Sequence, residues 1–417
     1  MPPFLSSVRP QLHRTVLDNG LVVLVTENPV ADIVAARLFV RAGTGHERSS
    51  EAGLFALLTA LLTKGTDRLS SMEIAEQVES MGASLSSDTS ADYSLLSLKT
   101  VSADFEPVLT LAAHLLRSPA FPEAELDLEQ RLTLQSIRSM QEQSFTVAYN
   151  ALRAAMYGDH PYARPGIGTV ETVSSFTQDQ LLKIHQTYFR PDNMVISICG
   201  RISPEAAVNL VAQHFGDWQA PTERVPDLIY PPLPNQPSQQ VLPQDTNQTI
   251  VMVGYQAPPV KHPIYGVLKL ISTYLGNGLS SRLFVELREK RGLAYDVSAF
   301  YPTRLGMSQF VAYMGTAPEN TAVALEGLRY ESERLITEAL TPEELTASKN
   351  KLLGQYALGK QTNTQIAQLL GWYEVLGLGT GFDQSFQEAI AAITLEEIQA
   401  TAQDCFLAPY TVQLGPT

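Results

Sequence analysis

The sequence predicts an α+β fold of two homologous domains. Each would be a mostly antiparallel sheet with helices packed on one face, and a pseudo-two-fold duplication would relate the two. Three observations lead to this class. The chain has 417 residues, which is long for one domain. Similar stretches recur at an offset of roughly 210 to 217 residues. Within each half, strand patterns come first and helix patterns follow.

The repeat is carried by short matches that keep the same order in both halves. Ser70-Ser71, Glu76, Glu79 and Gly82 correspond to Ser280-Ser281, Glu286, Glu289 and Gly292. Near the end of each half, a Thr precedes a helical pattern that leads into a strand: Thr177 before QDQLLKIHQTYF and MVISICG, Thr394 before LEEIQATAQDCF and TVQLG. Thr is a good N-cap, and acidic residues follow it in both helices.

The elements of the first half follow in order. Residues 17–28 read as strand with a turn at Asn19-Gly20, and residues 32–43 alternate like a second strand. Residues 51–62 are apolar on all sides and predict a buried helix. Residues 70–82 form a capped amphipathic pattern, residues 84–101 return to strand, and residues 105–119 predict a further helix.

A proline-rich stretch separates the halves. Proline removes backbone donors and fixes φ, so such a stretch is typical of an extended linker. The predicted boundaries are 1–217 for the first domain, 218–248 for the linker and 249–417 for the second domain. The prolines that define the linker are Pro221, Pro226, Pro231, Pro232, Pro234, Pro237 and Pro243.

Composition excludes several classes of protein. The formal net charge is −14 without a basic stripe, which argues against nucleic-acid or anionic-membrane binding. Cys199 and Cys405 lie in apolar stretches and predict two buried thiols rather than a disulfide framework. The start MPPFLSSVRP lacks the pattern of a signal peptide, and no apolar run reaches membrane-spanning length. We expect a cytoplasmic protein, although a leader already removed would leave no trace.

Residues 53–66, GLFALLTALLTKGT, resemble the signature of the pitrilysin or inverzincin zinc peptidases, G-x-A-H-F-L-E-H-M-x-F-K-G-T. The flanking residues Gly53, Leu58 and Lys64-Gly65-Thr66 match. In H-x-x-E-H, two His one turn apart bind Zn²⁺ and the Glu acts as general base.

The zinc-site residues of that family are missing from this sequence. Ala56, Thr59 and Ala60 replace the motif, and the third ligand position falls on Ser136, with Glu129 retained as its upstream acidic partner. Ala has no ligand atom, and a Thr hydroxyl is a far weaker base than a carboxylate. We therefore expect no metal and no catalytic residue in this chain.

A replacement metal site is not indicated elsewhere. No two of the seven His lie within five residues of each other in the sequence. His114 and His185 sit in apolar helical patterns, where a structural role is expected. The positions are His13, His46, His114, His160, His185, His214 and His262.

Residues 275–302 resemble the second-domain signature of the same family, a glycine-rich loop followed by an Arg and a Tyr seven residues apart. Here these are Gly276 and Gly278, then Arg288 and Tyr295. The resemblance implies that they bind the substrate peptide, because guanidinium and phenol groups can donate to carbonyl oxygens. The alternative is structural: a basic helix end capped by Gly292 and a half-buried strand tyrosine.

The resemblance covers nearly the whole chain, including HRTVLDNGLVVLVTENP and the stretch from YGDHPYARPG to MVISICG. In heterodimeric members, one chain carries the zinc and its partner supplies the opposite wall of the peptide chamber. The expected function is that of the non-catalytic, substrate-binding subunit of such a pair, with zinc in the partner. Two alternatives stay open: a peptide-binding or chaperone-like homodimer without hydrolysis, and a structural core-type subunit.

Overall fold

The structure, a computed structural model, describes residues 11–234 and 236–416. The chain forms two compact units. The first unit comprises Met1–Leu134, Gly166–Leu228 and Gly359–Thr380. The second comprises Gln135–Pro165, Ile229–Leu358 and Gly381–Thr417. The opening residues 1–10, where a signal peptide was not expected, lie outside the described part.

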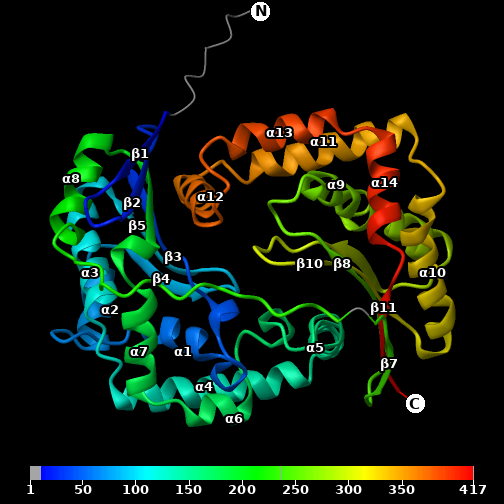
Figure 1. Cartoon of the computed structure of the whole chain (residues 1–417), viewed down its shortest axis with the longest axis horizontal. Helices are drawn as coiled ribbons and strands as arrows, with labels where there is room; N and C mark the ends of the chain where they lie inside the picture. The colour runs from blue at the N-terminus through cyan, green and yellow to red at the C-terminus, as the bar shows by residue number, and fades with distance from the viewer. Residues whose placement is uncertain (1–10, 235, 417) are drawn as a thin grey trace, which may run out of the picture. The chain divides into compact units, whose positions relative to one another are not determined.

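A mostly antiparallel sheet forms the centre of the first unit, in the order β1-β2-β6-β3-β5-β4 (Figure 1). Only β2 and β6 pair in parallel. The predicted turn at Asn19-Gly20 joins β1 and β2, with Gly20 at φ 89°. The strands are β1 (Leu12–Val16), β2 (Val22–Glu27), β3 (Ile33–Val40), β4 (Ser84–Thr89), β5 (Ser94–Val101) and β6 (Met194–Gly200).

Helices cover one face of this sheet. α3 packs on β5, α8 on β2 and α1 on β4. Ser70 and Thr177 accept from backbone N–H groups and start α2 and α7 as capping boxes, as their sequences predict. The helices are α1 (Leu54–Leu61), α2 (Ser71–Ser80), α3 (Phe105–Arg117), α6 (Val170–Ser175), α7 (Gln178–Tyr188), α8 (Pro204–Phe215) and the first part of α4 (Glu123–Gln141).

The opposite face of the first sheet receives α12 (Asn363–Val375), which comes from the second half of the sequence. Val375 packs into a cluster with Phe39 and Val195. Gly371 allows the close approach, because a Cβ there would lie 2.3 Å from the Phe39 ring. Burial of this apolar face is what fixes α12 to the sheet.

The second unit has a sheet of order β7-β11-β8-β10-β9, in which only β7 and β11 are parallel. Its strands are β7 (Gln239–Pro243), β8 (Thr249–Ala257), β9 (Asp296–Phe300), β10 (Ser308–Thr316) and β11 (Tyr410–Gly415).

The helices of the second unit again lie mainly on one face, where Tyr255 of β8 contacts Phe406, which follows α14, and Glu333 of α10. α5 packs against β8 and β11, and Gly254 of β8 leaves room for Leu152 and Met156 of α5. The helices are α5 (Ser144–Tyr157), α9 (Tyr265–Gly276), a π-helix η6 (Phe284–Lys290), α10 (Thr321–Glu333), α11 (Pro342–Leu358), α13 (Phe382–Ala392) and α14 (Leu395–Cys405).

The two units confirm the predicted duplication. β2-β6-β3-β5-β4 and β7-β11-β8-β10-β9 have the same order and place their parallel pair at the same point. α5 and α12 hold corresponding places in the two halves, yet each packs on the sheet built mainly by the other half. This exchange is why each unit contains three chain segments.

The structure differs from the contiguous domain boundaries in this exchange and in the linker. Residues 239–243, inside the predicted linker, form β7 and pair with β11. Pro243 is tolerated because it ends an edge strand, where no further ladder bond is required. Within the described residues, no helix is long and apolar enough to cross a membrane.

Candidate functional site

α1 carries the positions that correspond to the zinc motif. Ala56 and Ala60 are half-buried, and Thr59 is 2% exposed. The Thr59 hydroxyl donates to the carbonyl oxygens of Phe55 and Ala56 at 2.9 and 3.0 Å. It is therefore engaged by its own helix, a common behaviour of Thr inside helices.

Glu47 holds the start of α1, a role that the sequence did not reveal. Its carboxylate accepts from the backbone N–H groups of Gly53 at 2.9 Å and Phe55 at 2.8 Å, and the residue is 5% exposed. A buried carboxylate at a helix N-terminus satisfies orphan donors and complements the helix dipole. The scaffold that would present the zinc motif is thus intact, although the ligands are not.

α4 carries the position of the third ligand. Glu129 forms an ion pair with Lys64 at 3.2 Å, so both residues that match the family at this point are engaged with each other. Ser136, two turns further along α4, is exposed and offers a hydroxyl where the family has a carboxylate. The side chains present at these positions do not fit a zinc ion.

No three His, Cys, Asp or Glu side chains are grouped to hold a metal among residues 11–234 and 236–416. His185 Nε2 is hydrogen-bonded to the Leu116 carbonyl oxygen at 2.9 Å, which agrees with the structural role expected for this side chain. His46 and His160 accept backbone N–H bonds through Nδ1. Burial lowers the pKa of His46, His160 and His185 to about 4.

The two cysteines are not paired with each other. Cys199 is buried and Cys405 is half-buried. Burial raises the pKa of the Cys199 thiol to about 12 and that of Cys405 to about 11. Both are protonated thiols at neutral pH, so neither is an activated nucleophile.

Arg288 lies in η6, the π-helix of the second unit. Its side chain is exposed, and its guanidinium carbon lies 4.8 Å from the centre of the Phe284 ring. Cation–π stacking of this kind orients a guanidinium without consuming its N–H donors. π-helical turns are rare and frequently occur at functional sites. The corresponding α2 of the first unit is a regular α-helix.

Tyr295 directly precedes β9 and is 64% exposed. Its backbone N–H donates to the Gly315 carbonyl at 2.9 Å, which ties the residue to β10. The ring is not packed into the core, so the structural alternative of a half-buried strand tyrosine does not describe it. Gly292 has φ 63° at the end of η6, as expected for a helix cap.

The glycine-rich loop has its own structural reasons for glycine. A Cβ at Gly276 would lie 1.9 Å from the Ala299 backbone nitrogen, so β9 requires glycine there. Gly278 has φ 75°, a backbone conformation that favours glycine, and a Cβ there would lie 3.4 Å from Lys351 Nζ. Lys351 and Gln355 of α11 hold the loop through Asn277, whose amide donates to Gln355 Oε1 at 2.7 Å. A role of both glycines in peptide binding stays a prediction.

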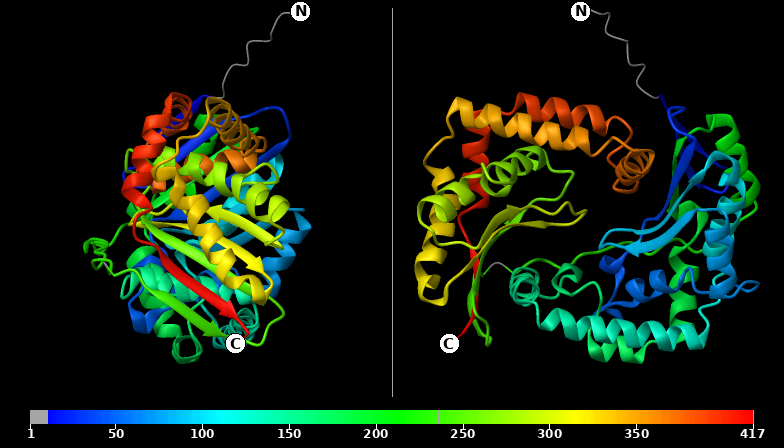
Figure 2. Two further views of the ribbon diagram at one scale, coloured as in Figure 1. Left: turned by 90° about the vertical axis from the view of Figure 1, so that its right-hand side faces the viewer. Right: turned by 180° about the vertical axis from the view of Figure 1, so that it is seen from behind.

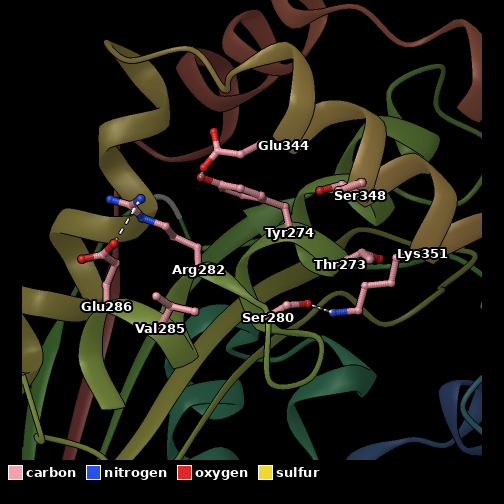
Figure 3. A pocket seen from close by; sticks show the side chains of 10 residues that line it. Thr273, Tyr274, Ser280, Arg282, Val285, Glu286, Glu344, Ser348 and Lys351 are labelled. Carbon is pink, nitrogen blue, oxygen red and sulfur yellow. Dashed lines mark hydrogen bonds and ion pairs between the residues drawn. The ribbon is translucent and has the colours of Figure 1, made fainter. Parts of the chain in front are cut away.

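A pocket of about 210 Å³ lies beside this loop, between α9, η6 and α11 (Figure 3). Two pairs of its polar side chains are bonded to each other: Tyr274 donates to Glu344 at 3.1 Å, and Arg282 lies 3.3 Å from Glu286. Arg282 also meets Glu331 at 2.8 Å, as does Arg291 at 3.4 Å. These contacts give both arginines a structural role, because the buried carboxylate of Glu331 needs such partners.

Two regions of the sequence match models of known protein families. Residues 22–170 match the family described as insulinase (peptidase family M16), and residues 175–352 match the peptidase M16 inactive domain. The chain belongs to peptidase family M16. Together the two matches span most of the described residues and confirm the resemblance drawn from the two motifs.

The similarity to two curated relatives and to one solved structure extends over 97% of this chain. An uncharacterized zinc protease of Mycobacterium leprae is 28% identical over 97% of this chain and 91% of its own. One of Bacillus subtilis is 26% identical over 97% of this chain and 98% of its own. A peptidase M16 inactive-domain structure from Pseudomonas fluorescens has a TM-score of 0.91 at 24% identity, covering 97% of this M16 chain and 98% of its own.

Proposed function

We propose that this chain is the non-catalytic, substrate-binding subunit of a heterodimeric zinc peptidase. The observation that carries the proposal is Thr59, whose hydroxyl is bonded within its own helix at the position of the catalytic base. With Ala56 and Ala60 on either side, α1 offers neither a base nor an imidazole. The Arg288 and Tyr295 side chains, in contrast, are exposed and available to a ligand.

The chemistry of the exposed pair suits a peptide backbone. A guanidinium presents fixed N–H donors that can bind two carbonyl oxygens, and Phe284 restrains Arg288 without occupying them. A phenol can donate to a carbonyl oxygen as it becomes an oxyanion. Binding and orientation of the peptide are therefore the tasks that this chain can perform.

A homologous partner subunit would complete the active site. In such a partner, bound zinc would polarise the scissile carbonyl and activate water. This chain would provide the opposite wall of the peptide chamber and contribute Arg288, Tyr295 and the loop with Gly276 and Gly278. Holding a peptide in reactive geometry accelerates hydrolysis even though the metal belongs to another chain.

Reconstitution tests this function. The partner to be used is a homologous chain of similar length that carries H-x-x-E-H. Mixed with it, this chain should form a one-to-one complex on size exclusion, and peptidase activity should greatly exceed that of the partner alone. Equal activity with and without this chain would reject the subunit role. A homodimer that binds peptides without hydrolysis would then be the better account.

A further inference from the structure

The duplication leaves two elements of the first unit without a counterpart in the second. β7 corresponds to β2, β11 to β6, and α10 to α3, since α3 and α10 both have 13 residues and follow β5 and β10. Within residues 11–234 and 236–416, however, nothing in the second unit takes the places of β1 and α8.

In the first unit, α8 fills the space beside α3 and over β2. It buries Ala207, Val211 and Phe215, which recur every four residues along one face. Polar contacts at its C-terminal end fix its position: Arg117 of α3 donates to the His214 carbonyl at 2.7 Å and to Asp217 at 2.6 Å. α8 is thus an amphipathic helix held by apolar packing and by one cationic side chain.

The same space in the second unit is an open groove of about 560 Å³. Gln239 of β7 and Gln413 of β11 form part of it, and Leu325, Glu326, Arg329 and Tyr330 of α10 form its wall. Tyr330 is 51% exposed and Val241 of β7 is 68% exposed. The left view of Figure 2 shows β7 and β11 side by side at this edge, with α10 crossing nearby.

The groove differs from the α8 seat in charge. α3 and α10 have equal length, so their residues can be matched position by position. Glu326 takes the position of Thr110, which contacts His214 in the first unit. Glu333 takes the position of Arg117, which binds Asp217. Arg329 is already paired with Glu333 at 3.1 Å, so Glu326 leaves the groove with net negative charge. A helix seated here needs cationic side chains where α8 has His214 and Asp217.

We propose that this groove is a docking site for an amphipathic helix of a partner protein, seated as α8 is seated in the first unit. The helix would carry apolar residues at every fourth position and Lys or Arg near its C-terminal end. Such a helix-in-groove interface buries apolar anchors, while the cations set register and direction. This surface is distinct from the proposed peptide-binding residues and does not depend on them.

A peptide with the sequence of α8 itself, altered at two positions, tests the proposal. The probe is a fluorescein-labelled peptide of residues 203–218 carrying His214→Lys and Asp217→Lys, titrated with the full chain while anisotropy is measured. Saturable binding is expected, about tenfold tighter than for the unsubstituted peptide. Glu326→Lys and Tyr330→Ala should each weaken binding about tenfold, since both side chains are exposed wall residues.

Two controls separate the groove from general charge attraction. Glu343→Lys, an exposed carboxylate on α11, should leave binding unchanged, and a scrambled peptide of equal charge should not bind. The proposal is overturned if the lysine peptide shows no saturation up to about 1 mM, or if Glu326→Lys has no effect. It is also overturned if the chain self-associates and Glu326→Lys abolishes that association, because the occupant is then a second copy.

Discussion

Asn363, the first residue of α12, donates its side-chain N–H to the carbonyl of Ile33, the first residue of β3, at 2.9 Å across 330 positions of sequence. Asn28 donates to the Asn363 side-chain oxygen at 2.7 Å. At the other end of α12, Arg14 contacts Glu374 at 2.8 and 3.1 Å. The exchanged helix is therefore fixed to the first sheet at both ends.

Gly371→Ala should destabilise the first unit by about 1–3 kcal/mol, because the new Cβ would lie 2.3 Å from the buried Phe39 ring. Gly354→Ala in α11 is the matched control, since no atom lies within 4 Å of its Cβ position. It should stabilise by roughly 0.5–1 kcal/mol through helix propensity. Urea unfolding measures the change in the free energy of unfolding for both variants. If both variants change stability in the same direction, α12 is not packed as described.

The purified chain should hold no stoichiometric zinc and show no chelator-sensitive peptidase activity. Ala56 and Ala60 have no ligand atoms, and the Thr59 hydroxyl is bonded within α1. Elemental analysis after extensive dialysis measures the metal content. One zinc per chain would contradict the assignment of the degenerate motif.

Acid should destabilise the fold within a defined pH window. The pKa of His185 is about 4 in the folded protein against 6.5 as the ordinary value, so the unfolded state binds more protons between these values. Stability is then lost as pH falls from 6.5 towards 4, by up to about 2 kcal/mol for this group between pH 7 and pH 5. Urea unfolding at several pH values gives the slope.

His185→Phe separates this effect from other titrations. It retains a ring beside Phe189, whose centroid lies 5.0 Å away, but removes the titrating group. The variant should be less stable at pH 7, because the Leu116 carbonyl loses its partner. Its stability should nevertheless fall less between pH 7 and pH 5; an unchanged slope would show that His185 does not titrate as inferred.

Phe284→Leu should impair substrate binding without removing any group proposed to touch the peptide. The guanidinium of Arg288 lies 4.8 Å from the Phe284 ring, and loss of the ring frees the Arg288 side chain to adopt other rotamers. In the reconstituted complex, KM should rise about 3- to 10-fold with kcat little changed. Arg288→Ala should raise KM at least as much, and Arg288→Lys should rescue only partly because it lacks the planar fork. If KM is unchanged for both Phe284→Leu and Arg288→Ala, the cation–π contact between Arg288 and Phe284 has no role in substrate binding.

The helices and their ends in the duplicated fold could be predicted because the signals that start and end a helix lie close together in the sequence. Capping boxes at Thr177 and Thr394 and glycine caps at Gly82 and Gly292 are set by neighbours within a few residues. The exchange of α5 and α12 could not be predicted in the same way. Asn363 and Ile33 meet only through the tertiary fold, and no local periodicity encodes which sheet a helix covers.

The candidate site was predictable only in part. The resemblance to the two family signatures supplied the motif positions, so Ala56, Thr59, Ala60, Ser136, Arg288 and Tyr295 could be named from sequence. Glu47 was missed because a buried cap six residues before Gly53 lies outside the usual capping spacing. The π-helical geometry around Arg288 depends on the hydrogen-bond register of η6, which composition does not reveal.

The most direct test of the proposed function is the turnover of the reconstituted complex with Tyr295→Phe. The substitution removes only the hydroxyl of a side chain that is 64% exposed, so folding and assembly should be unaffected. If the phenol donates to the developing oxyanion, kcat should fall about 100- to 1000-fold while KM changes little. Size exclusion checks that the one-to-one complex is intact. Wild-type kcat in an intact Tyr295→Phe complex would contradict the account and leave this chain as a scaffold.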